Sequence, residues 1–291
     1  MDYPIRNLET PEDMRKLEDL HRKVWGADDT DVVPGHIVLA IGHNGGIVLG
    51  ALDGERLVGY VLGFLGTDHR SPDRPAMARL KHASHELAVD PEYRNQGVGF
   101  ALKLAQRQWV NRQGVRLITW TYDPLLSLNA QLNIRRLGAV CDTYRENEYG
   151  KMEDRLNKGI ASDRFQVDWW ITSHRVKQRL EGPRQALDLA HFLGAGAMRI
   201  NQVTINEHGL PQPDQRIVEP DGTLGIVEIP ADYLTLKARD HGLAVAWREH
   251  TRILFQTAFQ AGYLVTDFIY LREERFPRSY YMLTHGEGRL G

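Results

Sequence analysis

The stretch that decides the fold runs from Glu86 to Leu102 and has the sequence Glu-Leu-Ala-Val-Asp-Pro-Glu-Tyr-Arg-Asn-Gln-Gly-Val-Gly-Phe-Ala-Leu. Its first residues are mostly apolar and predict a strand over 86–89, which an Asp-Pro pair ends. Its last residues open a helix predicted over 100–112, where apolar side chains recur at helical spacing. The turn between the strand and the helix holds two glycines, Gly97 and Gly99, separated by one residue.

This turn has the composition of an anion site. Two glycines at this spacing let the backbone approach a ligand closely and leave successive N–H groups pointing the same way. The following helix adds the positive end of its dipole, and Arg94 would add a full positive charge. The turn therefore predicts a pyrophosphate site. It is neither a Rossmann fingerprint nor a P-loop, because the glycine offsets differ and no Gly-Lys-Ser/Thr follows. From the turn alone, a purely structural role stays open.

Strands and helices continue on both sides of this stretch. Toward the N-terminus the patterns predict a strand over 3–8, a helix that Thr10 caps, a short helix over 36–42 and a hairpin of strands 47–53 and 57–65. Toward the C-terminus they predict strands over 115–122, 139–144 and 165–171, with a helix over 127–137. This order indicates an α/β (α+β mixed sheet) fold with helices covering the sheet.

The pattern changes from about residue 172. Strands are predicted near 198–205, 224–229, 263–271 and 279–283, with helices over 231–239 and 243–261. We expect two domains: residues 1–171 with the glycine turn, and residues 172–291 as a smaller α+β subdomain for an acceptor pocket or dimerisation. The succession helix, Gly262, strand echoes helix, Gly138, strand, but the echo is too short to establish a repeat.

Composition excludes several other classes of protein. The chain has 291 residues and a formal net charge of -2. It has no basic stripe, so no nucleic-acid partner is expected. No run approaches the roughly 20 apolar residues of a membrane span, and no signal peptide is evident. Cys141 is the single cysteine, and the twelve histidines show no metal-ligand spacing. We expect a cytoplasmic protein without metal or membrane partner.

The strand, the Asp-Pro turn, the glycine pair and the apolar helix together resemble the central motif of the GNAT acyltransferases. The signature of that motif is Gln or Arg, two residues, Gly, one residue, and Gly or Ala. Counted generously, the resemblance covers residues 3–171, with Ala130 at the usual small position of the later helix. It implies the GNAT fold, an acyl-CoA co-substrate such as acetyl-CoA, and acyl transfer to an amine.

Carried over position by position, the resemblance also implies site residues. Leu87 and Val89 would pair through their backbone with the pantetheine arm, and an amide near Ala88 or Val89 would polarise the thioester carbonyl. The N–H groups from Asn95 to Gly99 would hold the pyrophosphate. The implied cofactor-binding set is Leu87, Ala88, Val89, Arg94, Asn95, Gln96, Gly97, Val98, Gly99, Asn129 and Asn133.

Glu86 is the candidate general base, because an amine must lose its proton to attack and the family often places a carboxylate near this strand position. A merely exposed or salt-bridged Glu86 stays open, and His85 is a weaker alternative for the base. The tyrosine that protonates the leaving thiolate in many members is replaced by Ile134. Tyr122 and Tyr144 stay open as substitutes, as does departure of the thiolate without an acid. The segment 31–34 falls where relatives often line the acceptor pocket.

These residues together predict an N-acyltransferase. It would move acetyl, or another short acyl group such as succinyl, to a primary amine of a small molecule such as an amino acid, by direct attack in a ternary complex. The alternative is a non-catalytic acyl-CoA sensor, which the loss of the tyrosine at Ile134 favours. A protein that uses the glycine turn for another nucleotide is a weaker rival. A homodimer formed through the C-terminal subdomain stays open.

Overall fold

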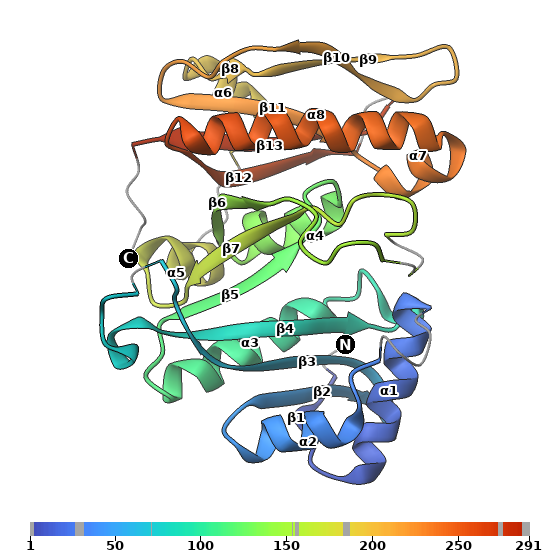
Figure 1. Cartoon of the computed structure of the whole chain (residues 1–291), viewed down its shortest axis with the longest axis vertical. Helices are drawn as coiled ribbons and strands as arrows, with labels where there is room; N and C mark the ends of the chain where they lie inside the picture. Colours follow the sequence, from blue (N-terminus) through green and yellow to red (C-terminus); the bar gives the residue numbers. More distant parts are fainter. Residues whose placement is uncertain are drawn as a thin grey trace. The chain divides into compact units, whose positions relative to one another are not determined.

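The computed structural model describes residues 3–26, 32–70, 72–152, 154, 157–182, 187–272 and 276–286 (Figure 1). The chain forms two compact units. The first comprises Met1–Trp120 with Glu153–Lys158, and the second comprises Thr121–Met152 with Gly159–Gly291. Residues 121–152 and 159–171 thus belong to the same compact unit as the C-terminal residues. The assignment of catalysis to residues 1–171 stays a prediction.

The first unit is built on a mixed sheet. Its strands follow the order β1 (Ile5–Asn7), β2 (Ile47–Asp53), β3 (Arg56–Thr67), β4 (Leu80–Val89) and the beginning of β5 (Leu117–Tyr122). Neighbours are antiparallel from β1 to β4, whereas β4 and β5 are parallel. The helices are α1 (Pro11–Trp25), α2 (Gly35–His43) and α3 (Val98–Arg112). Two 3₁₀ turns lie at Ala76–Arg79 and Pro91–Tyr93. The predicted α/β fold with a mixed sheet is confirmed, and β4 begins earlier than the strand predicted over 86–89.

Helices α1 and α3 cover opposite faces of this sheet. On one face, Leu17 and Leu20 of α1 share a buried cluster with Tyr60 of β3. On the other face, a Cβ added to Gly59 would lie 2.9 Å from Val98 and 3.1 Å from Leu102 of α3. Adjacent residues of a strand point to opposite faces, so Gly59 and Tyr60 identify the two sides. Glycine at position 59 lets α3 lie directly against β3.

Helix α1 begins where the sequence predicts. The Thr10 side chain accepts a hydrogen bond from the Asp13 N–H at 3.1 Å, and the Asp13 carboxylate accepts one from the Thr10 N–H at 3.1 Å. This reciprocal capping box satisfies N–H groups that the first turn of a helix leaves without partners. It fixes the start of the helix, and therefore which of its side chains face β3 and β4.

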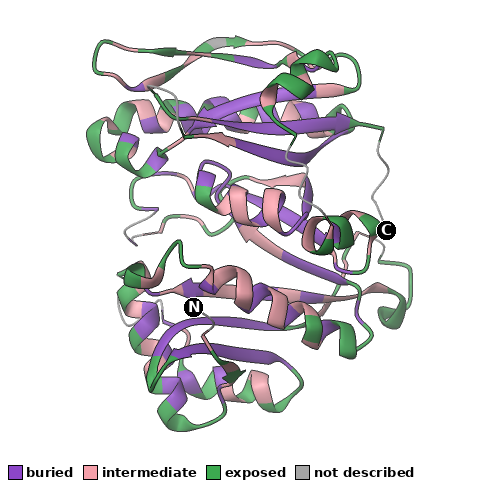
Figure 2. Cartoon of the chain, turned by 180° about the vertical axis from the view of Figure 1, so that it is seen from behind, coloured by how far each residue is buried: buried purple, intermediate pink, exposed green. Residues whose placement is uncertain are grey.

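In the second unit the strands lie in the order β7 (Arg164–Trp170), β6 (Val140–Arg145), β12 (Tyr263–Leu271), β13 (Arg278–His285), β11 (Leu224–Pro230) and β8 (Met198–Arg199). Strands β9 (Asn201–Ile205) and β10 (Pro211–Ile217) form a separate ribbon. The helices are α4 (Ser127–Ala130), a π-helix at Gln131–Arg136, α5 (His174–Glu181), α6 (Leu189–Gly194), α7 (Tyr233–Arg239) and α8 (His241–Gln260). Buried residues lie mostly along the strands of each unit (Figure 2). The extra C-terminal strands and helices agree with the α+β elements predicted there.

The same succession of elements occurs twice in the second unit. The helix over 127–136 leads through Gly138, at φ +76°, into β6 and then β7. Helix α8 leads through Gly262, at φ +86°, into β12 and then β13. In each case the two strands pair antiparallel, and β6 also pairs antiparallel with β12 at Cys141 and Val265. The echo noted in the sequence therefore corresponds to a matching order of secondary structure.

A buried ion pair joins distant segments of the second unit. The Arg248 guanidinium on α8 donates two hydrogen bonds to the Asp123 carboxylate, one of them 2.9 Å long. Asp123 also accepts from the N–H of Leu125 at 2.9 Å. Arg248 is only 3% exposed. Removing one partner would leave an uncompensated charge in the interior.

We predict that Arg248→Met lowers the free energy of unfolding by about 3–5 kcal/mol, because Asp123 would keep its charge without a counterion. The double variant Asp123→Leu with Arg248→Met should recover part of this loss, because no buried charge remains. Urea unfolding of the wild type, both single variants and the double variant measures the coupling. A single-variant loss below about 1 kcal/mol, within the range of an ordinary surface pair, would contradict the prediction.

Candidate active site

A β-bulge at His85 shapes the candidate site. On β3, Leu62 and Gly63 are consecutive, but their partners on β4 are Glu86 and Ser84, so His85 is an extra residue. In a regular strand Ser84 and Glu86 would share one face, because side chains alternate. The bulge reverses this alternation. Ser84 meets α3 on one face of the sheet, whereas Glu86 meets Tyr60 on the face that α1 covers.

Beyond the bulge, one edge of β4 is available to a ligand. Within the described part of the chain, the pairing of β4 with β5 consists of His82 with Ile118 and Ala83 with Thr119. On the β3 side, the N–H of Asp90 donates to the Val58 carbonyl at 2.9 Å. Because N–H groups alternate along a strand, those of Leu87 and Val89 point to the other edge. These are the two residues predicted to pair with the pantetheine arm.

The Glu86 carboxylate lies in a polar cluster against α1. Tyr60 Oη donates to Glu86 Oε2 at 2.8 Å, and His21 Nδ1 lies 3.2 Å from Tyr60 Oη and 3.5 Å from Glu86 Oε2. The other oxygen, Oε1, lies 3.7 Å from His85 Nε2, which is too long for a hydrogen bond. The Glu86 side chain is 12% exposed, so it is neither a surface carboxylate nor sealed from substrate.

Two opposing effects set the ionisation of Glu86. Burial raises its pKa, but hydrogen bonds from His21 and Tyr60 outweigh burial and hold the pKa below its ordinary value. Burial, and then the neighbouring Glu86 charge, raise the pKa of Tyr60 well above its ordinary value. The phenol therefore keeps its proton and continues to donate it to the carboxylate. At neutral pH the site presents an ionised Glu86 that is held in one orientation.

His21 and Tyr60 are not among the residues predicted from the sequence, although the positions of both are informative. His21 follows Leu17 by four residues, so it lies on the helix face that packs against the core. Tyr60 sits within an apolar strand run, where a buried hydroxyl needs a partner. Identifying Glu86 as that partner required the register of β3 with β4.

The glycine turn leads into the N-terminus of α3, as predicted. Gly97 is the N-cap residue at φ +87°, and Asn95 also has a positive φ, of 63°. Among the described residues, no side chain makes a capping hydrogen bond to this helix end. The N–H groups of Val98 and Gly99 at this helix end are therefore suited to hold an anion. A Cβ added to Gly97 would meet nothing within 4 Å, so the space beside this residue is open.

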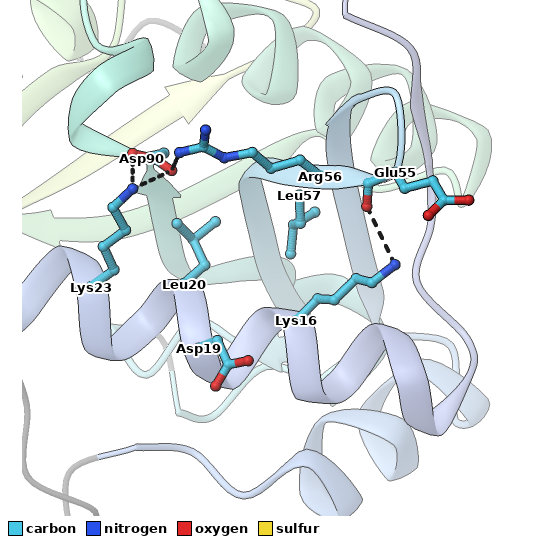
Figure 3. A pocket seen from close by; sticks show the side chains of 8 residues that line it. All are labelled: Lys16, Asp19, Leu20, Lys23, Glu55, Arg56, Leu57 and Asp90. Carbon is cyan, nitrogen blue, oxygen red and sulfur yellow. Dashed lines mark hydrogen bonds and ion pairs between the residues drawn. The ribbon is translucent and has the colours of Figure 1, made fainter.

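An ionic cluster holds the chain just before this turn. Asp90 accepts from Lys23 Nζ at 2.9 Å and from Arg56 Nη2 at 2.7 Å, and Glu92 pairs with the same two cations. Figure 3 shows Lys23, Arg56 and Asp90 of this cluster, which line a cavity of about 250 Å³. Its lining residues are Lys16, Asp19, Leu20, Lys23, Glu55, Arg56, Leu57 and Asp90. Because Glu86 is not among them, we assign the cluster to positioning the Asp-Pro turn.

The remaining predicted cofactor residues, Asn129 and Asn133, lie in the second unit. Asn129 is partly exposed, whereas Asn133 is buried. The α-helix changes to a π-helix at Gln131, so a spacing of four residues no longer corresponds to one turn. The backbone carbonyl of Asn133 accepts from the Ala139 N–H at 3.0 Å. Their contact with the cofactor stays a prediction.

The residues considered for the leaving-group acid are engaged elsewhere. Ile134 is fully buried. Tyr122 Oη lies 3.1 Å from Tyr281 Oη, and Tyr144 donates to Asp163 at 2.7 Å. Burial, as the largest cause, raises the pKa of both tyrosines above the ordinary value. Both hydroxyls therefore already have partners within the second unit, and a role for either as the acid stays a prediction.

Comparison with known proteins relates part of the chain to one family. Residues 6–133 match the model of the acetyltransferase (GNAT) family. Similar solved structures include the ribosomal-protein-S18-alanine N-acetyltransferase from Escherichia coli, at 14% identity and a TM-score of 0.44 over 64% of this chain and 99% of that one. Another is Arabidopsis thaliana NAA60 in complex with acetyl-CoA, at 18% identity and a TM-score of 0.44 over 57% of this chain and 98% of that one. Among curated proteins, no match was found.

The matched part of the chain is similar to a GNAT acetyltransferase domain, and this similarity supports acyl transfer from an acyl-CoA. The matched residues contain the glycine turn, Glu86 and most of the helix that follows β5. Among the described residues, no helix is both long and apolar enough to cross a membrane. The described residues also contain no group of three or more His, Cys, Asp or Glu side chains that could hold a metal ion.

We predict that Gly97→Ala weakens CoA binding by roughly tenfold. Alanine at a positive φ strains the backbone by about 1–2 kcal/mol, and its methyl group would enter the open space beside the turn. Gly54→Ala is the matched control, because Gly54 has φ +60° in the β2–β3 turn and equally open surroundings. Titration calorimetry should give wild-type affinity for the control and weaker affinity for Gly97→Ala. Equal affinities in both variants would exclude a cofactor role for this turn.

Proposed function

We propose that the protein transfers a short acyl group, acetyl or another such as succinyl, from acyl-CoA to a primary amine of a small molecule. Attack would be direct, in a ternary complex of both substrates. The observation that carries the proposal is the place of Glu86. The bulge puts an ionised carboxylate one residue away from the amides of the free edge of β4.

The cofactor would bind along this edge and at the adjoining turn. The N–H groups of Leu87 and Val89 point away from β3, as an extended pantetheine arm requires. The N–H group of Ala88 shares the β3 side with that of Asp90, so Val89 is the better candidate to polarise the thioester carbonyl. The turn from Arg94 to Gly99 would hold the pyrophosphate, and Asn129 and Asn133 would flank the arm.

Glu86 would act as the general base. A primary amine is mostly protonated at neutral pH and must lose a proton to attack. A carboxylate with a low pKa is a weak base, which suits transfer through a bridging water rather than complete removal of the proton before attack. Tyr60 and His21 would keep Oε2 occupied and leave Oε1 to face the water or the amine. The thiolate would leave without a dedicated acid, since thiols are comparatively acidic.

A small acceptor, such as an amino acid, suits the recessed position of Glu86, whose side chain is 12% exposed. Acyl-CoA is available in the cytoplasm, where we place the protein. Residues 1–171 would carry the catalytic residues. Residues 172–291 would complete an acceptor pocket or form a dimer interface.

We predict that Glu86→Gln lowers kcat by about 10²–10⁴-fold, because general-base catalysis contributes that much. CoA affinity should stay at the wild-type value, since the amide keeps the shape of the side chain. Glu12→Gln is the control, because its carboxylate is exposed on α1 and lies outside the cluster that positions the turn. Acyl transfer to a panel of amino acids and other small amines gives the rate, and calorimetry gives the affinity. A wild-type rate in Glu86→Gln would disprove the base assignment.

The same assays separate the alternative functions. A non-catalytic sensor would bind acyl-CoA tightly and transfer nothing to any amine of the panel. A protein that uses the glycine turn for a different nucleotide would be stabilised by ATP or NAD but not by CoA. A ligand at 100 times its dissociation constant stabilises the folded state by about 2.7 kcal/mol, which a thermal-shift measurement detects.

The pH profile should report the hydrogen bond from Tyr60. In the wild type the lowered pKa keeps Glu86 ionised, so its contribution to kcat/KM should fall only below about pH 4.3, the ordinary value for Glu. In Tyr60→Phe the Glu86 carboxylate loses the hydrogen bond from Tyr60, whereas burial still raises its pKa. The pKa of Glu86 should rise, and the acid limb should move to higher pH. An unmoved limb would mean that Glu86 does not control it.

A further inference from the structure

Two half-exposed aromatic rings lie beside the candidate base. The centroids of the Phe64 and His85 rings are 6.1 Å apart, and the angle between the ring planes is 49°. Phe64 is 38% exposed, and the His85 side chain is 49% exposed. Aromatic side chains commonly line the sites where small molecules bind, because a ligand can bury their faces. The two rings are therefore candidates for contact with a ligand.

Both rings lie on the face of the sheet that bears Glu86. Tyr60 and Leu62 of β3 belong to the buried cluster under α1, and alternate residues of a strand share a face, so Phe64 points to the same side. His85 reaches this side as well, because its Nε2 lies 3.7 Å from Glu86 Oε1. The bulge thus leaves an exposed ring next to the carboxylate.

The cover that α1 provides on this face ends near Glu86. Ala88 of β4 and Leu62 of β3 are fully buried in the cluster that includes α1. The Glu86 side chain is 12% exposed, and the rings of His85 and Phe64 are more exposed still. Exposure therefore increases along the two strands from Ala88 through Glu86 to the ring pair.

The two oxygens of Glu86 face different neighbours. Oε2 accepts from Tyr60 at 2.8 Å and lies 3.5 Å from His21 Nδ1, whereas Oε1 lies on the side of His85. In the proposed function Oε1 faces the amine, directly or through one water. The acceptor nitrogen would then lie next to the His85 ring, and Phe64 is the ring beside His85.

The spacing along β3 suits a short linker in the acceptor. Glu86 pairs with Leu62, and Phe64 follows Leu62 by two residues, which span about 6.6 Å along a strand. A two-carbon linker between an amine nitrogen and a planar ring covers a distance of this order. The nitrogen would lie at Glu86 and the ring against Phe64.

We propose that Phe64 and His85 bind the apolar end of the acceptor, which is a primary amine joined by a short linker to an aromatic ring. This inference rests on the proposed function, because it assumes that Glu86 receives the amine proton. The ionised Glu86 attracts the ammonium form of the acceptor, and the acceptor ring buries the open faces of the two side chains. Aromatic pairs stabilise more than their buried area alone, so an aromatic ring is preferred to an aliphatic one.

The deciding experiment compares 2-phenylethylamine, 2-cyclohexylethylamine and ethylamine as acceptors, with acetyl-CoA and succinyl-CoA as donors and rates calculated per unprotonated amine. We expect kcat/KM for 2-phenylethylamine to exceed that for ethylamine by about tenfold or more, as burial of an apolar group gives. It should exceed that for 2-cyclohexylethylamine by about 2–10-fold, the contribution of an aromatic pair. Equal values for the two ring-bearing amines would overturn the aromatic class of acceptor.

Phe64→Ala tests the first ring. Its KM for 2-phenylethylamine should rise by about tenfold, and the ratio of kcat/KM between 2-phenylethylamine and ethylamine should fall toward one. Leu65→Ala is the matched control, because Leu65 is the next residue of β3, is 44% exposed and points to the opposite face. This control should keep the wild-type ratio. A wild-type ratio in Phe64→Ala would overturn the role of Phe64.

Two substitutions test the second ring. His85→Ala removes the ring and should lower the ratio of kcat/KM between 2-phenylethylamine and ethylamine. His85→Phe keeps an aromatic ring and should restore the ratio. A wild-type ratio in His85→Ala would remove His85 from the binding site for the acceptor ring.

The outcomes separate this inference from the function on which it rests. Wild-type protein that acylates ethylamine and 2-phenylethylamine equally well overturns the inference and leaves acyl transfer to small amines standing. Wild-type protein that acylates none of the three amines and none of the amino acids overturns the proposed function, and the inference with it.

Discussion

One extra residue in β4 determines how the candidate site is arranged. Without His85 as a bulge, Ser84 and Glu86 would share a face of the sheet. Glu86 could not then reach Tyr60 while Ser84 reaches Lys103. The bulge also lies just beyond the last paired residue of β4, Ala83, where the edge toward β5 becomes available. The opposite orientations of Ser84 and Glu86 depend on this single departure from a regular strand.

The core of the first unit makes the bulge tolerable. An inserted residue leaves a strand partly unpaired, and that cost must be offset by contacts that fix its neighbours. Here the hydroxyl of Tyr60 and the ring of His21 hold Glu86, and both belong to elements that pack into the same apolar cluster. The capping box at Thr10 sets where α1 begins and so places His21 opposite β4. The geometry of the site is thus supported by residues far from it in the sequence.

Local patterns were sufficient for the elements around the glycine turn. Strand, turn and helix between Glu86 and Arg112 follow from apolar periodicity, an Asp-Pro pair and glycines, and each of these acts over a few residues. The bulge could not be predicted, because it is defined by the partner strand β3. The pairing of His21 and Tyr60 with Glu86 was missed for the same reason. In the second unit, the change from α-helix to π-helix at Gln131 also left no local signal. Local sequence patterns do not give the pairing register of β3 with β4, and this register decides which side chains meet.

The pairing of β6 with β12 does not depend on the protein concentration, because both strands belong to one chain. The two strands follow matching helix and glycine elements, and they meet antiparallel at Cys141 and Val265. Between separate chains, a strand contact of this kind would weaken as the protein concentration falls. Within one chain, the connecting segments set the effective concentration of one strand at the other, and this value does not depend on the protein concentration. The edge of β6 toward β12 is therefore paired within the chain, and it does not offer the backbone groups that exposed edge strands present to other molecules.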